Sequence, residues 1–259
     1  DEPEPENQKE EHQSYSVYEQ AQRYRAAKAV LQDIYALDAE HAEAVKALEQ
    51  LWEEGYTVAA HQLGKFYRDD LSTLRDHEKA EEWFRRSAEA GNDFSEYALG
   101  KLLLTQKRWE EALGWLGKAA DHGNQFARYR LGKIYLAGES VPKDVAKALA
   151  YLTASADQGN QFAQYTLGKL YLLGRDVPPD REQAREWLIR AAAQGNEYAR
   201  FFLDCFDQFR DPSVMLAATK LLYHMSRIFQ SNSVPPSNPS GIRIDSKRRR
   251  RLMEKRMAM

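Results

Sequence analysis

A repeat of 36 residues constrains the fold of this chain more than any other feature of its sequence. Gly132 and Gly168 are 36 residues apart, and so are Tyr135 and Tyr171, so residues 123–195 read as one pattern written twice. Self-similarity at a fixed period of about 20–50 residues is typical of solenoid proteins, in which each repeat packs against its neighbours. The remaining sequence can be interpreted as continuing this period, ending it or departing from it.

Each repeat predicts two α-helices, named helix A and helix B. Helix A has the pattern Ala-x-x-x-Leu-Gly-x-x-Tyr, which begins at Ala59, Ala127 and Ala163 and has a looser copy at Ser95. Its apolar residues are three or four positions apart, as expected for a helix with one buried face. Helix B pairs an alanine with an aromatic residue three positions later, as at Ala80. We expect the motif glycine to let helix B approach closely, because glycine has no side chain.

A Gly-Asn pair follows each helix B. Glycine tolerates the left-handed backbone at a helix end, and asparagine can cap the start of the next helix. The sequence therefore predicts where one repeat ends and the next begins. The pairs are Gly91-Asn92, Gly123-Asn124, Gly159-Asn160 and Gly195-Asn196.

The repeats at residues 56–210 resemble the Sel1-like repeat, a relative of the tetratricopeptide repeat. The resemblance implies an all-α fold, a right-handed α-solenoid of antiparallel helix pairs. The connections that begin at Gly138 and Gly174 also fit the longer inter-helix loop of that family. The second copy departs from the pattern, since Gly100 and Gly132 are only 32 residues apart and the longer loop is missing.

Two segments precede the repeats. Residues 1–13 hold six acids and one lysine, contain proline and lack apolar periodicity, so we expect them to be disordered. Residues 14–55 have apolar positions three or four apart and predict a degenerate first helix pair. Asp38 is a candidate cap for the second helix of that pair.

Three segments follow the repeats. Residues 211–230 predict a helix that caps the stack, with Val214 and Leu221 among the residues expected to be buried. Residues 231–241 are rich in serine and proline, which is typical of a linker. Residues 242–259 carry eight Lys or Arg and two acids and predict a basic tail helix.

The sequence shows no pattern of catalytic or metal-binding residues. The six histidines are scattered, and the single cysteine, Cys205, allows neither a multi-cysteine zinc site nor an intrachain disulfide. The glycines recur at the repeat period, which indicates packing and not a phosphate-binding loop. No apolar run is long enough to predict a membrane span, and no secretory signal is visible. We therefore expect a cytoplasmic, non-catalytic protein without a cofactor.

The candidate binding site is the surface formed by the A helices, which line the concave groove in the tetratricopeptide relatives. A lysine follows each motif glycine, and a tyrosine or histidine lies four residues earlier, on the same face of the helix. Ammonium and phenol groups suit the carboxylates and carbonyls of an extended partner peptide. The alternative is that the lysines are only solvated and the tyrosines pack between repeats. The predicted partner-binding residues are His61, Lys65, Arg68, Tyr97, Lys101, Tyr129, Lys133, Tyr165 and Lys169.

A second aromatic column lies two residues after each Gly-Asn pair. It consists of Phe94, Phe126, Phe162 and Tyr198. One interpretation is that these rings form the core between repeats. The other is that they form an apolar margin of the groove.

The basic tail supports an alternative function. Its five consecutive cations could contact nucleic-acid phosphates, an acidic protein or nothing. They are Lys247, Arg248, Arg249, Arg250 and Arg251.

Most of the chain, and in particular the runs at residues 211–229 and 246–259, also resembles the carboxy-terminal region of bacterial mobilisation relaxases, in which a DNA-nicking domain precedes Sel1-like repeats. The resemblance implies a fragment, the accessory region of a larger bacterial protein, and the abrupt ends of the chain agree with this. The catalytic tyrosine and histidine cluster of a relaxase are not present. The predicted function is therefore a scaffold for a protein or peptide partner, and the alternative is a DNA-binding accessory module.

Overall fold

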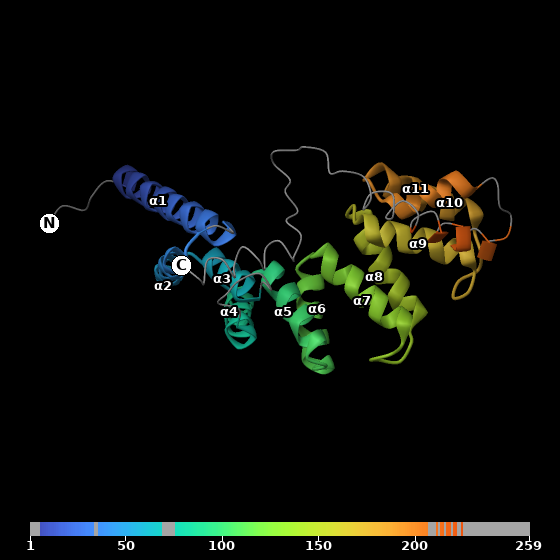
Figure 1. Ribbon diagram of the computed structural model, residues 1–259, viewed down its shortest axis with the longest axis horizontal. Helices are drawn as coiled ribbons and strands as arrows, with labels where there is room; N and C mark the ends of the chain where they lie inside the picture. Colours follow the sequence, from blue (N-terminus) through green and yellow to red (C-terminus); the bar gives the residue numbers. More distant parts are fainter. Residues whose placement is uncertain are drawn as a thin grey trace, which may run out of the picture. The chain divides into compact units, whose positions relative to one another are not determined.

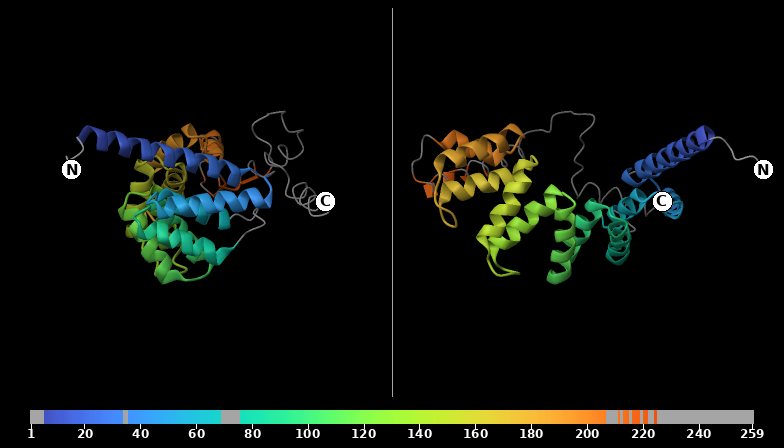
Figure 2. Two further views of the ribbon diagram at one scale, coloured as in Figure 1. Left: turned by 90° about the vertical axis from the view of Figure 1, so that its left-hand side faces the viewer. Right: turned by 180° about the vertical axis from the view of Figure 1, so that it is seen from behind.

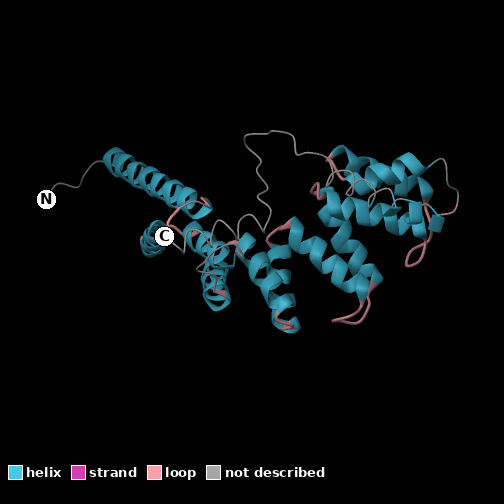
Figure 3. Ribbon diagram, in the orientation of Figure 1, coloured by secondary structure: helices cyan, strands magenta, loops and turns pink. Residues whose placement is uncertain are grey.

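The computed structural model describes residues 6–33, 36–68 and 76–206, with residues 211, 213, 214, 216–218, 220, 221 and 224. Helices make up every regular element in this part of the chain, and no strand occurs there (Figures 1 and 3). The helices are α1 (Glu6–Gln32), α2 (Asp38–Glu53), α3 (Val58–Arg68), α4 (His77–Glu89), α5 (Asp93–Thr105), α6 (Trp109–Asp121), α7 (Gln125–Ala137), α8 (Val145–Asp157), α9 (Gln161–Leu173), α10 (Arg181–Ala193) and α11 (Glu197–Phe206).

The chain forms two compact units, residues 1–200 and 201–259. Within the first unit each helix packs against the next one in sequence, and the tightest packing joins α3 to α4, α5 to α6, α7 to α8 and α9 to α10 (Figure 2). These are the predicted pairs of helix A and helix B. The expected fold, an α-solenoid of antiparallel helix pairs, is confirmed.

The motif glycine of each helix A lies directly against helix B. A Cβ atom on Gly132 would lie 2.7 Å from Cγ of Leu152 and 3.2 Å from the carbonyl oxygen of Ala148. Leu152 is fully buried, so it has little room to move. This confirms that glycine is required for the close approach of the two helices. The equivalent pairs are Gly64 with Phe84, Gly100 with Leu116 and Gly168 with Leu188.

The Gly-Asn pairs form the turns between repeats as predicted. Gly123 has a φ of 91°, in the left-handed region that favours glycine. The side-chain oxygen of Asn124 accepts hydrogen bonds from the backbone N–H groups of Phe126 and Ala127, at 3.0 Å each. Asn160 makes the same contacts in the next repeat. These caps satisfy donors that an uncapped helix start would leave unpaired.

The amino-terminal helix pair differs from expectation at two points. Helix α1 begins at Glu6, inside the segment 1–13 that composition predicted to be disordered. Glutamate, glutamine and lysine are good helix formers, so an acidic run can extend an adjoining helix. Asp38 is the first residue of α2 and not its cap; instead the Glu40 carboxylate accepts a hydrogen bond from the backbone N–H of Leu37 at 2.6 Å.

The segments after the repeats fall largely outside the described residues. Within 211–230, the described side chains of Val214 and Leu221 are 46% and 62% exposed, so the expectation that they are buried is wrong. The predicted linker 231–241 and the basic tail 242–259, with its five consecutive cations, lie outside the described residues.

The connection inside the second repeat is short, as its sequence predicted. Residues 106–108 join α5 to α6, whereas the corresponding loops in the next two repeats span residues 138–144 and 174–180. Lys107 takes a φ of 63° to close this turn. Arg108 stabilises the turn from outside, through ion pairs to Glu81 at 2.8 Å and Glu111 at 2.7 Å.

Candidate partner-binding surface

Three side chains recur on one face of every helix A. In α7 they are Phe126, Tyr129 and Lys133, at positions i, i+3 and i+7, which share one side of an α-helix. We call the complete set the A-helix surface. The other triplets are Val58, His61 and Lys65 in α3, Phe94, Tyr97 and Lys101 in α5, and Phe162, Tyr165 and Lys169 in α9.

The two predicted aromatic columns contact each other across the repeats. The ring centroids of Tyr129 and Phe162 are 6.1 Å apart, within the range of favourable aromatic pairs. Each tyrosine or histidine therefore packs between repeats, as the structural alternative stated, and it also supports the ring of the following repeat. The other pairs are His61 with Phe94 at 6.5 Å, Tyr97 with Phe126 at 6.0 Å and Tyr165 with Tyr198 at 5.8 Å.

The phenylalanine column does not form the core between repeats. Phe94, Phe126 and Phe162 are 55%, 39% and 49% exposed. Each ring contacts the preceding repeat with part of its surface and leaves the rest open to solvent. This corrects the core interpretation and matches the alternative, an apolar margin beside the lysines. Aromatic rings held in this way offer contact area at low cost in conformational entropy.

Three lysines of the A-helix surface carry their positive charge on exposed side chains. Lys65, Lys101 and Lys133 are exposed, and none of them forms an ion pair with another residue in the described part of the chain. Partial burial lowers the pKa of Lys101, and the positive charges of Arg68 and Arg130 lower it further. An anionic group bound among these cations would relieve their repulsion.

Cations on the B helices are compensated differently. Arg85 lies 2.8 Å from the Glu81 carboxylate one helical turn away. The Lys118 ammonium lies 4.2 Å from the centroid of the Trp115 ring, in a cation–π contact. Lys65, Lys101 and Lys133 therefore differ from these two B-helix cations, which have compensating contacts.

His61 and Arg68 have structural contacts that their sequence positions did not indicate. Nδ1 of His61 lies 2.7 Å from the hydroxyl of Ser95, which in turn donates to the hydroxyl of Ser87 at 2.8 Å. Burial lowers the pKa of His61 to about 4, with a further contribution from the charges of Lys65 and Arg68. The guanidinium of Arg68 also lies over the Phe84 ring, 5.4 Å from its centroid. His61 therefore belongs to the surface as a neutral ring at pH 7.

The pKa of His61 predicts a loss of stability in mild acid. Between pH 6.5, the ordinary pKa of histidine, and about pH 4, the unfolded chain binds this proton and the folded chain does not. The contribution of neutral His61 to the free energy of unfolding is therefore complete above pH 6.5. It is lost as the pH falls toward 4, and the loss is at most about 3 kcal/mol. Urea unfolding at pH 7 and pH 4.5 should show a larger loss for the wild type than for His61→Gln. An NMR titration of the His61 ring with a midpoint above pH 6 would contradict this prediction.

Two residues beside the A-helix surface were not predicted from sequence. Arg130 adds a cation between Lys101 and Lys133, and Trp109 starts α6 with an indole that is 40% exposed. Both residues differ in type from those at the equivalent positions of the other repeats. This difference was the sequence signal that could have identified them. The positions equivalent to Arg130 hold Gln62, Ala98 and Thr166, and those equivalent to Trp109 hold His77, Val145 and Arg181.

The described ranges contain neither a metal-binding cluster nor a membrane-spanning helix. No group of three or more His, Cys, Asp or Glu side chains in the described ranges is placed to hold a metal ion. No helix within those ranges combines the length and apolar character needed to cross a membrane.

The helix pairs, their motif glycines and the capped turns define a repeat protein of the α-solenoid class. Four segments match the family model described as the Sel1 repeat, at residues 57–92, 110–124, 125–160 and 161–196. The unmatched gap covers helix A of the second repeat, which has the looser motif and the short turn. The resemblance to Sel1-like repeats therefore has independent support in these segments.

Solved structures of Sel1 repeat proteins have the same fold. A Sel1 repeat protein from Oxalobacter formigenes is 29% identical, with a TM-score of 0.66 over 81% of this chain and 88% of that one. The protective antigen c5321 of uropathogenic Escherichia coli, which displays an SLR fold, is 22% identical, with a TM-score of 0.63 over 86% of this chain and 50% of that one. The immunity protein Pa5087 from Pseudomonas aeruginosa is 24% identical, with a TM-score of 0.51 over 83% of each chain.

Comparison with curated proteins gives no match. The resemblance to mobilisation relaxases has no support among the relatives described here and stays a prediction.

Proposed function

We propose that this chain is a non-catalytic scaffold that binds a segment of a protein partner on its A-helix surface. Sel1 repeat proteins generally act as scaffolds for protein–protein interactions. The observation that supports this surface in particular is the column of exposed phenylalanines, which lies beside Lys101 and Lys133, two lysines that form no ion pair in the described part of the chain. Apolar anchors bordered by charged groups are typical of protein interfaces.

The test uses peptides selected from a random library displayed on phage, with the full chain as the target. Selected peptides should lose affinity about tenfold or more for the double variant Phe126→Ser with Phe162→Ser, because aromatic anchors dominate binding energy. They should also lose affinity for Lys101→Glu with Lys133→Glu, where the charge is reversed. Fluorescence anisotropy with labelled peptides measures both effects.

The matched controls lie on the B helices. Ile189→Ser removes an apolar side chain that is 51% exposed on α10, and Lys118→Glu reverses a charge on α6. Neither should change peptide affinity by more than about twofold, since neither residue lies on the A-helix surface. Equal binding by the folded A-surface variants and the wild type would remove the basis for this assignment.

The proposals that the chain belongs to a relaxase or binds DNA depend on the sequence alone. As the accessory region of a relaxase, the scaffold would position partner proteins beside DNA, and the alternative function would be DNA binding through the five cations at residues 247–251. Those cations lie outside the described residues. Deleting residues 242–259 distinguishes the two functions, because peptide binding by the A-helix surface should survive the deletion and DNA retention should not.

A further inference from the structure

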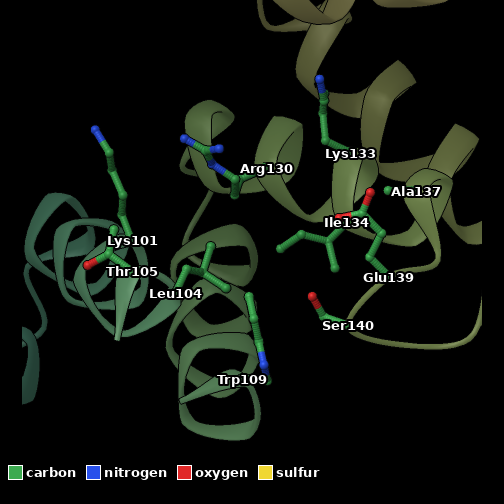
Figure 4. Close-up of a pocket in the computed structure, with 10 residues that line it drawn as sticks. All are labelled: Lys101, Leu104, Thr105, Trp109, Arg130, Lys133, Ile134, Ala137, Glu139 and Ser140. Carbon is green, nitrogen blue, oxygen red and sulfur yellow. The ribbon is translucent and has the colours of Figure 1, made fainter. Parts of the chain in front are cut away.

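A pocket lies between the second and third repeats. It has a volume of about 350 Å³ and is bounded by α5, the start of α6, α7 and the loop that follows α7. In Figure 4 the cationic ends of three side chains lie on one side of this pocket, and two aliphatic side chains and an indole lie on the other side. These residues are Lys101, Arg130 and Lys133, and Leu104, Ile134 and Trp109.

The pocket lies beside the turn of the second repeat, which lacks the longer loop. In the third and fourth repeats the longer loops lie against one another, through an ion pair between Lys143 and Asp176. Val177 of the last loop is only 7% exposed, so that loop covers apolar surface. The turn at residues 106–108 is four residues shorter than the loop at 138–144 and has no corresponding valine.

Residues at equivalent positions in successive A helices differ in their exposure to solvent. Leu102, Ile134 and Leu170 occupy the same position in three successive A helices. Leu102 and Leu170 are 6% and 9% exposed, whereas Ile134, beside the short turn, is only partly buried. Trp109 is 40% exposed at the same place. Ile134 and Trp109 thus form an apolar floor beside the short turn that is more exposed than Leu102 and Leu170.

The charged side of the pocket lacks internal partners. Lys101, Arg130 and Lys133 form no ion pair with residues in the described part of the chain, and Nε of Arg130 is buried without a hydrogen-bond partner. A buried donor without a partner is unfavourable, so a bound acceptor that reaches it would stabilise the complex. Glu139 is the acidic residue in the lining and is outnumbered by the three cations.

We propose that this pocket binds an acidic segment of a partner protein, taking one bulky apolar side chain between Leu104, Ile134 and Trp109 and its flanking carboxylates on the three cations. The proposal rests on the scaffold function above and names the chemistry of its ligand. Carboxylates suit the forked geometry of arginine, and the apolar floor favours a peptide side chain over a nucleic-acid backbone. The pocket volume is in the range of small binding sites, about 300–1,000 Å³.

The experiment uses the phage-selected peptides and three pocket variants of the full chain. Trp109→Ala removes part of the floor, Arg130→Gln removes the central charge, and a loop graft replaces residues 106–108 with a copy of residues 174–180 to restore the cover. We expect the selected peptides to carry acids on both sides of a bulky apolar residue. Each point variant should weaken their binding about tenfold, and the graft should abolish it.

Control variants distinguish a failure of the pocket proposal from a failure of the proposed scaffold function. Ile189→Ala and Lys118→Gln should leave the affinity unchanged, and circular dichroism verifies that each variant is folded. If the loop graft does not fold, the affinities of Trp109→Ala and Arg130→Gln for the peptides still test the pocket proposal. Peptides that depend on Phe126 and Phe162 but not on Trp109 or Arg130 would overturn the pocket and leave the scaffold function standing.

Two further measurements identify other occupants. A short oligothymidylate that binds with dependence on Trp109 and Arg130, and more tightly than the peptides, would overturn an acidic peptide as the ligand. Self-association in sedimentation that Trp109→Ala abolishes would assign the pocket to a second copy of the chain. A library that yields no binder at all would count against both the pocket and the scaffold function.

Discussion

Gly132→Leu should lower the free energy of unfolding by about 3 kcal/mol, because overpacking at this site has no room to relax. A Cβ atom alone would lie 2.7 Å from Cγ of Leu152, and the backbone oxygen of Ala148 is 3.2 Å away. Leucine gains about 1 kcal/mol of helix propensity over glycine, which does not offset the clash. Urea unfolding followed by circular dichroism at 222 nm measures the change.

The same substitution at Gly114 is the matched control. Gly114 lies inside α6, and apart from its two chain neighbours and the nearby backbone of its own helix no atom is within 4 Å of the position of an added Cβ. Gly114→Leu should therefore be neutral or stabilising by up to about 1 kcal/mol. Equal destabilisation at both sites would mean that the motif glycine is not required for the approach of helix B.

Phe84→Ala should destabilise the chain by about 4 kcal/mol, since truncating a buried phenylalanine leaves a large cavity. The Phe84 side chain is fully buried and lies over Gly64, and its ring also contacts His61 at 5.7 Å between centroids. Thermal and urea unfolding measure the loss.

Phe94→Ala provides the comparison, because the same atoms are removed from a ring that is 55% exposed. We expect a loss of no more than about 1 kcal/mol there. If Phe94→Ala proved as costly as Phe84→Ala, Phe94 would belong to the core and not to the binding surface. The comparison thus tests the stability prediction and the placement of the A-helix surface together.

The charged side chains of the A helices and of the B helices differ in their contacts. Several B-helix cations pair with carboxylates one turn away or lie over aromatic rings, as Arg190 does over Trp187 at 4.7 Å. A-helix lysines in three successive repeats lack such pairs within the described residues, and the exposed rings beside them are held by contacts to the preceding repeat. A surface that is rigid, partly apolar and positively charged suits an acidic peptide ligand.

The repeat pattern by itself determined the helix pairs, their order and their turns. These features depend on local chemistry: an asparagine that caps a helix, a glycine with a positive φ, and apolar residues at helical spacing. The role of the motif glycine was also predictable from sequence. A glycine that recurs at a regular spacing inside successive helices of one chain indicates that helix B approaches helix A closely there. Residue identities within one or two turns of helix carry all of this information.

Composition was a weaker guide where a residue type serves more than one purpose. The acidic run before residue 14 predicted disorder, but the same residues are good helix formers, and α1 includes them from Glu6 onward. Similarly, Asp38 and Glu40 are both suited to a helix start, and the structure uses Glu40 to bind the backbone of Leu37.

Only the tertiary structure decided which side chains on the A helices remain available. Ile134 is only partly buried and Leu170 is 9% exposed although they occupy equivalent positions in two A helices, because Ile134 lies beside the short turn of the preceding repeat. The pocket at Trp109 likewise depends on a loop that is missing from one repeat while its neighbours retain it. Exposure is set by what packs on a residue from about 30 positions away, and a pattern of residue types within one repeat does not contain that contact.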